Sequence, residues 1–261
     1  MSITAKYLNQ LKPQLSDRDL AIMAEVGRFK LMTGGQIERL FFAHLPEKSR
    51  SRNRQAVMRR LVTHHVMERV GERRMGGSAR GSASYLYTLG IAGQHLAENH
   101  SKRPRREYSW YEPTIGHFLA IAELYVTLME AHWAGRLALL SFETEPHSWR
   151  NFAGRTLKPD AFVRLGIRSA DGRAYRGQAF IEVDRGTQRG TKIATKLPQY
   201  LAYRRHEEAH QPGRLFPRVV FLAPHDDRVA YLERLVDEHP QHRAIFTVGL
   251  LDDPVTALLK P

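Results

Sequence analysis

The sequence contains no cysteine, so disulfide bonds and thiolate metal sites are excluded. It also lacks an uninterrupted apolar segment long enough to cross a bilayer, and it shows no secretory signal. Hydrophobic residues nevertheless make up 42% of the 261 positions, which is enough to build the core of a globular protein. We therefore expect a cytoplasmic protein without a membrane partner.

Acidic residues are scarce relative to basic ones. Forty Lys and Arg face 27 Asp and Glu, which leaves a formal net charge of +13 and favours a polyanionic partner. The imbalance is uneven along the chain, because residues 1–113 carry 20 basic and 10 acidic side chains whereas residues 114–261 carry 20 and 17. The first half is therefore the part expected to bind duplex DNA.

A charged, proline-containing stretch, ENHSKRPRREYSWYEP, separates these halves and has neither helical nor strand periodicity. We interpret it as a linker. The predicted organisation is a DNA-binding domain over residues 1–99, a basic linker over 100–113 and a second domain over 114–261.

The first domain has the order of a winged helix-turn-helix. Ser16 and Thr33 are expected to cap two helices, and SRSRNRQAVMRRLVTHH is expected to form a third. The segments HVMERVGERRM and SYLYTLG then alternate like the two strands of a hairpin around a glycine-rich turn. A third helix followed by a hairpin predicts a recognition helix and a wing.

Arginines concentrate on these two elements, where they can contact phosphates and base edges. The predicted DNA-binding residues are Arg50, Arg52, Arg54, Arg59 and Arg60 in the helix, and Arg73, Arg74 and Arg80 in the hairpin.

The second domain begins with a long apolar helix after Pro113 and continues with segments that predict the order αβββαβαβ. The predicted fold class is therefore α+β, with helices and strands segregated differently in the two domains. Pro159-Asp160 stands at the start of the second strand of this order, and Glu182-Val183-Asp184 stands at the end of the third.

This pattern resembles the PD-(D/E)xK nuclease superfamily over residues 114–250, which implies an α/β restriction-endonuclease-like domain. The resemblance implies that Asp160 and Glu182 bind Mg²⁺ or Mn²⁺, with Glu123 and Asp184 as further candidate ligands. Hard oxygen ligands without cysteine favour these ions over zinc. A shared ion requires the Asp160 and Glu182 carboxylates to lie within about 8 Å of each other.

The chain departs from the superfamily at the lysine, because Asp184 occupies the position where the lysine is expected. The following helix offers Lys196 and Lys192 as replacements, as in some members of the superfamily. Pro198 disfavours a continuous helix through this segment. We therefore expect the helix to begin near Lys196 and to leave Lys192 on a loop.

The whole chain, with KPDAFVRL, FIEVDRGT and TKLPQYLAYRR after a winged helix, further resembles replication-relaxation proteins of plasmids and other mobile elements. The resemblance implies a duplex-DNA-binding role in replication, in mobilisation or in their regulation.

Three alternatives stay open at this point. The protein is an active Mg²⁺-dependent endonuclease or nickase, a catalytically silent transcriptional regulator without a cofactor, or a homodimeric scaffold that recruits a partner enzyme of the replication or mobilisation machinery. In a silent domain, Asp184 would pair with a basic side chain such as Arg185 or Lys196.

Overall fold

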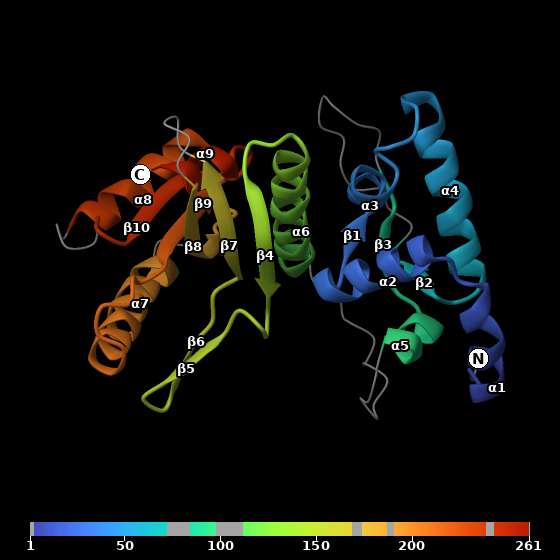
Figure 1. Cartoon of the computed structure of the whole chain (residues 1–261), viewed down its shortest axis with the longest axis horizontal. Helices are drawn as coiled ribbons and strands as arrows, with labels where there is room; N and C mark the ends of the chain where they lie inside the picture. The colour runs from blue at the N-terminus through green and yellow to red at the C-terminus, as the bar shows by residue number, and fades with distance from the viewer. Residues whose placement is uncertain are drawn as a thin grey trace. The chain divides into compact units, whose positions relative to one another are not determined.

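The computed structural model describes residues 3–71, 84–97, 112–168, 174–186, 191–238 and 243–260 (Figure 1). Contacts divide the chain into two compact units, Met1–Val126 and Thr127–Pro261. Both contain helices and strands, which confirms the α+β class. Among the helices in the described ranges, none combines the length and the apolar character needed to cross a membrane.

The N-terminal unit surrounds a small antiparallel sheet of order β1-β3-β2 with helices. Its elements are α1 (Ala5–Leu11), η1 (Lys12–Gln14), α2 (Asp17–Phe29), β1 (Met32–Thr33), α3 (Gly34–Phe41), α4 (Glu47–Thr63), β2 (Met67–Arg69), β3 (Leu86–Leu89), α5 (Ile91–Ala97) and the first part of α6 (Glu112–Trp133).

The helix starts follow from capping interactions that the sequence predicts. Ser16 and Asp19 form a reciprocal capping box at α2, and Thr33 forms another with Gln36 at α3. Helices α2, α3 and α4 then bury apolar side chains against one another, including Ile22, Ile37 and Met58. The sequence-predicted order of three helices and a strand pair is present, and the turn between β2 and β3 lies outside the described residues.

The first part of α6 belongs to the N-terminal unit. Ile115 packs with Leu31 and Leu86 in one buried cluster, and the Gln36 side-chain amide donates a 3.0 Å hydrogen bond to the Leu119 carbonyl. The sequence places the start of the second domain at residue 114, whereas the contacts place the division after Val126, within α6.

The C-terminal unit is built on a five-stranded mixed sheet of order β10-β9-β8-β7-β4. Its elements after α6 are β4 (Ala138–Thr144), β5 (Arg150–Phe152), β6 (Arg155–Leu157), β7 (Ala161–Arg168), β8 (Ala174–Val183), α7 (Thr191–His210), β9 (Arg218–Ala223), α8 (Asp226–Asp237), β10 (Phe246–Leu250) and α9 (Pro254–Leu259). The predicted αβββαβαβ order is found as α6, β4, β7, β8, α7, β9, α8 and β10, and the hairpin β5–β6 and helix α9 were not predicted.

One face of this sheet carries α7 and α8. Strand β8 pairs antiparallel with β7 and parallel with β9, and the register places Phe162 opposite Phe180. Both rings lie in the same buried cluster as Tyr200 of α7 and Leu232 of α8. Because side chains alternate along a strand, residues two positions before Phe162 and two positions after Phe180 lie on this same face.

We predict that Ile115→Ala loosens the N-terminal unit, because it removes a buried side chain that covers Leu31 and Leu86. Large-to-small changes in a core cost about 2–5 kcal/mol. Hydrogen–deuterium exchange of the full chain should become faster in α2 and β3. The control is Trp133→Ala in the same helix, whose side chain is half exposed and should leave that exchange unchanged. Equal exchange in both variants would contradict the assignment of early α6 to this unit.

Candidate functional site

Two carboxylates meet on the α7 side of the sheet. Ala161 pairs with Ile181, so Asp160 stands directly before β7 and opposite Glu182 of β8. The Asp160 backbone N–H donates a 3.1 Å hydrogen bond to the Ile181 carbonyl, and its Oδ2 accepts one of 2.7 Å from the Val183 N–H. The sheet register therefore fixes both the place and the orientation of Asp160.

Helix α7 adds a lysine and a tyrosine to this pair. Lys196 Nζ forms an ion pair with Glu182 Oε2 and lies 4.0 Å from Asp160 Oδ1. Tyr200, one helical turn later, donates a 2.7 Å hydrogen bond to Glu182 Oε1. Because one ammonium contacts both acids, the two carboxylate oxygens are no more than about 7 Å apart, which satisfies the distance condition for a shared cation.

The cluster opens into a pocket of about 450 Å³. Its wall is formed by β8, by α7 and by the unpredicted hairpin β5–β6 with the residue after it. The lining residues are Thr156, Leu157, Lys158, Glu182, Thr195, Lys196 and Gln199. Glu182 is only 3% exposed, yet it reaches this opening, so a small ligand in the pocket can contact its carboxylate.

The pKa values of Glu182, Lys196 and Tyr200 are all raised, but for different reasons. Burial and, to a lesser extent, the charge of Asp160 raise the pKa of Glu182 to about 7, against the opposing effect of Lys196. For Lys196, burial lowers the pKa, but the charges of Glu182 and Asp160 outweigh it and raise it overall. Burial and the Glu182 charge also raise the pKa of Tyr200 well above 10. The raised pKa of Glu182 means that a proton binds this carboxylate more readily than an ordinary one, and a divalent cation would compete with that proton.

Asp184 takes a different role from the one expected in a metal site. It is 4% exposed, its Oδ2 accepts a 2.6 Å charged hydrogen bond from Arg228 at the start of α8, and its Oδ1 accepts one of 2.8 Å from the Gly186 N–H. Gly186 has a φ of 70°, a conformation that glycine adopts without strain. The sequence predicted a basic partner for Asp184 in a silent domain, but it named Arg185 or Lys196 rather than Arg228.

The prediction that α7 begins near Lys196 is wrong, because the helix runs unbroken from Thr191 to His210 with Pro198 inside it. Burial of Ile193, Leu197 and Tyr200 against the sheet offsets the cost of about 3 kcal/mol that an internal proline brings. Lys192 thus lies in the first turn of α7, and its side chain is outside the part that the structure describes.

Glu123 lies in the N-terminal unit. Its Oε2 accepts a 3.0 Å hydrogen bond from the Gln36 amide, and its Oε1 forms an ion pair with Arg39. Both partners come from α3, so Glu123 ties α6 to that helix.

The predicted DNA-binding arginines of α4 fall into two groups. Arg54 is paired with Glu38 at 2.9 Å, Arg60 with the buried Asp19 at 2.6 Å, and Arg50 donates to the Leu45 carbonyl. A DNA contact by these three would have to use their remaining N–H groups. The residues Arg73, Arg74 and Arg80 lie outside the described ranges.

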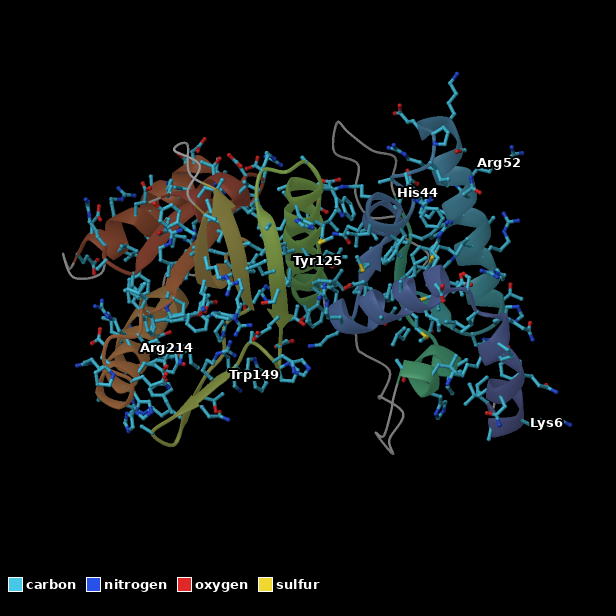
Figure 2. All side chains as sticks on the ribbon, viewed as in Figure 1. Lys6, His44, Arg52, Tyr125, Trp149 and Arg214 are labelled. Atoms are coloured by element: carbon cyan, nitrogen blue, oxygen red, sulfur yellow. The ribbon has the colours of Figure 1, made fainter. Side chains whose placement is uncertain are left out.

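Arg52 and Arg59 form the second group together with Lys48. All three side chains are exposed, and none has a hydrogen-bond or ion-pair partner among the described residues. Spacings of four and seven residues place them on one stripe of α4. Figure 2 shows Arg52 on the outer side of the helix.

Fold and site together define a two-unit α+β protein, with a basic helix in one unit and a buried acid–lysine cluster in the other. Residues 23–219, more than half of the chain, match the replication-relaxation family, and the chain therefore belongs to that family. Membership supports a role in the replication or mobilisation of mobile elements. A search of curated proteins finds no match, and a search of solved structures finds none either.

We predict that Glu182 makes folding stability depend on pH between about 5 and 8. Its folded pKa of about 7 lies above the ordinary value of 4.5, so its contribution is fully present below pH 4.5 and is lost as the pH rises through 7. Relative to Glu182→Gln, the native protein should lose stability on the order of a few kcal/mol over this window.

Urea denaturation of both proteins at several pH values measures this difference. The exposed Glu233→Gln on α8 serves as control and should track the native protein at every pH. The free energy of unfolding of the native protein minus that of Glu182→Gln should fall as the pH rises. A difference that stays constant or grows with pH would contradict the raised pKa of Glu182.

Proposed function

We propose that this protein binds duplex DNA through its N-terminal unit and acts in the replication or mobilisation of a mobile element. The observation that carries the proposal is the stripe of Lys48, Arg52 and Arg59 on α4. These cations are held on a rigid helix, and no carboxylate in the described residues neutralises them.

The elements around α4 support a winged helix-turn-helix. Helix α3 precedes α4 and is joined to it by the Arg54–Glu38 pair, while Arg60 and Asp19 fix α4 to α2. Strands β2 and β3 follow α4 and lead into and out of the predicted wing, and β3 also pairs with β1, which precedes α3. In such a domain the second helix of the motif enters the major groove and exposed basic residues contact phosphates.

We predict that Arg52→Ala combined with Arg59→Ala weakens duplex binding by about 2–5 kcal/mol, because each arginine contributes about 1–3 kcal/mol at a DNA interface. The slope of log affinity against log salt should fall in magnitude by about 2 if both contact phosphates. Fluorescence anisotropy with a labelled duplex measures both quantities.

The matched control replaces Arg205 and Arg234, which are equally exposed but lie on α7 and α8. Since it removes the same charge elsewhere, it should change affinity far less. Equal losses in the two double variants would mean that net charge, and not α4, governs binding.

A second candidate function is Mg²⁺- or Mn²⁺-dependent nicking or cleavage of DNA by the C-terminal unit. It is favoured by the contacts of Lys196 with Asp160 and Glu182, and by the pocket that Glu182 and Lys196 line. The residues fit a hard divalent cation, because they offer carboxylate oxygens from the start of β7 and the end of β8 beside each other. Such a cluster is expected in a restriction-endonuclease-like domain whose lysine comes from the following helix.

In this reading Asp160 and Glu182 would hold the ion, and a bound ion would polarise a phosphate oxygen and acidify a water molecule. Lys196 supplies a positive charge beside the scissile phosphate. Tyr200 orients Glu182 through its hydroxyl, and the Val183 N–H orients Asp160. The pairing of Lys196 with Glu182 means that an incoming cation must displace part of this ion pair.

We predict that Asp160→Ala, Glu182→Ala and Lys196→Ala each abolish metal-dependent nicking of supercoiled plasmid, and that Lys192→Ala reduces it less. Duplex affinity should stay the same or rise slightly in the two acid variants, because a negative charge near phosphate is lost. Below pH 7 the metal requirement should increase by up to about tenfold per pH unit, because a proton competes for Glu182.

The control is Glu233→Ala, an exposed acid on α8. If the native protein neither nicks plasmid with Mg²⁺ or Mn²⁺ nor binds these ions in calorimetry, the nuclease candidate fails. A silent regulator or a dimerising scaffold then accounts for the nuclease-like domain.

A further inference from the structure

A second group of basic side chains lies on the same sheet face as Asp160 and Glu182, toward the other end of β7 and β8. Arg164 stands four residues after Asp160, and Gln178 stands four residues before Glu182. They pair across the two strands, so both side chains project on the α7 side of the sheet. Together with Arg150 and Arg214 they line a small cavity of about 50 Å³, which we name the arginine pocket.

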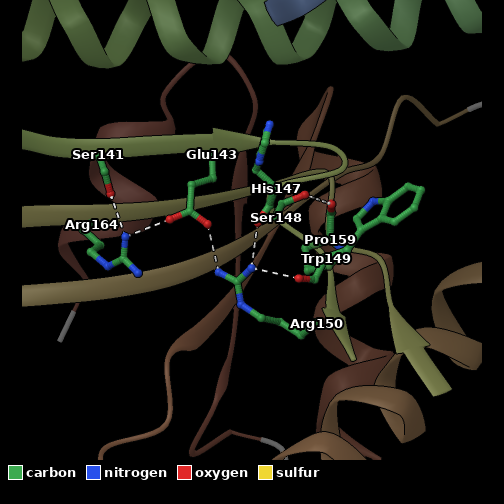
Figure 3. A network of polar contacts seen from close by, with 8 residues as sticks. All are labelled: Ser141, Glu143, His147, Ser148, Trp149, Arg150, Pro159 and Arg164. Carbon is green, nitrogen blue, oxygen red and sulfur yellow. Dashed lines mark hydrogen bonds and ion pairs between the residues drawn. The ribbon is translucent and has the colours of Figure 1, made fainter. Parts of the chain in front are cut away.

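Arg150 is held in place by several contacts at once. Figure 3 shows its guanidinium donating to Glu143 and to the backbone carbonyls of His147 and Trp149. The guanidinium also lies 4.6 Å from the centre of the Phe162 ring. Planar contacts of this kind fix a guanidinium before a ligand arrives.

Arg164 shares the same carboxylate. Its Nη1 donates to Glu143 at 2.8 Å and to the Ser141 hydroxyl at 3.2 Å, as Figure 3 shows. Its Nε and Nη2 have no hydrogen-bond partner among the described residues, and its side chain is 44% exposed. Arg164 is thus anchored on one side and retains free donors on the other.

The pocket carries more positive than negative charge. Glu143 alone balances Arg150 and Arg164, and Glu207 lies 3.5 Å from Arg214, whose side chain is 55% exposed. Three guanidiniums against two carboxylates leave one positive charge, and all three arginines line the opening. Guanidiniums bind phosphate oxygens through paired N–H groups.

We propose that the arginine pocket binds one backbone phosphate of a DNA strand that also passes the pocket lined by Glu182 and Lys196. The inference rests on the proposed function, since it assumes DNA as the partner. The volume of the arginine pocket is about 50 Å³. Pockets that enclose whole ligands have volumes of about 300–1,000 Å³, so this pocket suits a single phosphate and not a nucleotide.

The distance between the two pockets supports a strand over a free anion. Four residues along β7 span about 13 Å. Because a DNA strand carries a phosphate at every nucleotide, one strand can reach both pockets over this distance. Helix α7 and the hairpin β5–β6 contribute residues to both pockets, since Tyr203 and Arg150 line the arginine pocket and Lys196 and Leu157 line the other.

The test uses the full chain and the double variant Arg164→Gln/Arg214→Gln. Fluorescence anisotropy with a labelled single strand, and with a duplex of the same sequence, is recorded over a range of salt concentrations. The variant should bind at least one of the two DNA forms about tenfold more weakly. For that DNA form, the slope of log affinity against log salt concentration should fall in magnitude by about 1. Arg164→Lys/Arg214→Lys, which keeps the charge, should restore most of the slope.

Arg205→Gln/Arg234→Gln is the matched control, because it removes two exposed positive charges outside the pocket. If its affinity and salt slope change as much as those of the pocket variant, the proposal is overturned. The same holds if the pocket variant binds both DNA forms like the native protein. Circular dichroism of each variant verifies that the fold is retained.

A separate titration with inorganic phosphate distinguishes a free-anion site. Phosphate binding that is lost in Arg164→Gln/Arg214→Gln while DNA affinity is unchanged would replace the DNA assignment. Failure of the proposed function has its own signature, since it appears as unchanged duplex affinity in Arg52→Ala/Arg59→Ala, whatever the pocket variant does.

Discussion

The ion pair between Lys196 and Glu182 is the interaction on which the C-terminal unit depends. A carboxylate on a central strand, 3% exposed, is costly unless positive charge and hydrogen-bond donors meet it. Lys196 and Tyr200 supply both from a single helix. Because Lys196 and Tyr200 must both face Glu182, the rotation of α7 about its own axis is fixed. The same rotation places Gln199 at the pocket and Tyr203 in the aromatic core.

Both units use a buried charge pair to hold helices in position. In the N-terminal unit, Arg60 of α4 meets Asp19 of α2, and in the C-terminal unit Arg228 of α8 meets Asp184 after β8. Removing Arg228, which is largely buried, would leave Asp184 as an uncompensated buried charge, which costs about 3–5 kcal/mol. Some charged residues of this basic protein therefore stabilise the fold and are not available only for binding a ligand.

The sequence predicted that Asp160, Glu182 and Lys196 lie near one another, and the structure brings these three side chains together. Asp160 and Glu182 follow from the register of β7 and β8, and Lys196 follows from the helical stripe of α7. The continuity of α7 through Pro198 could not be predicted, because it depends on tertiary burial and not on local propensity.

The other omissions have similar causes. Arg228 is far from Asp184 in the sequence and carries no local pattern that would pair them. The strands β5 and β6 are three residues each, too short for a period-2 signal. Counting arginines on α4 found a basic helix but could not separate Arg52, which is unpaired among the described residues, from Arg54, which is 11% exposed beside Glu38.

The origin of the lysine has a consequence for the order of assembly during folding. Strands β7 and β8 are neighbours in sequence and pair as a hairpin, so both acids can come together through local contacts alone. Lys196 joins them only when α7 packs onto the completed sheet face. A nascent or partly folded chain therefore has the acids without the lysine, and the complete cluster is a property of the native state only.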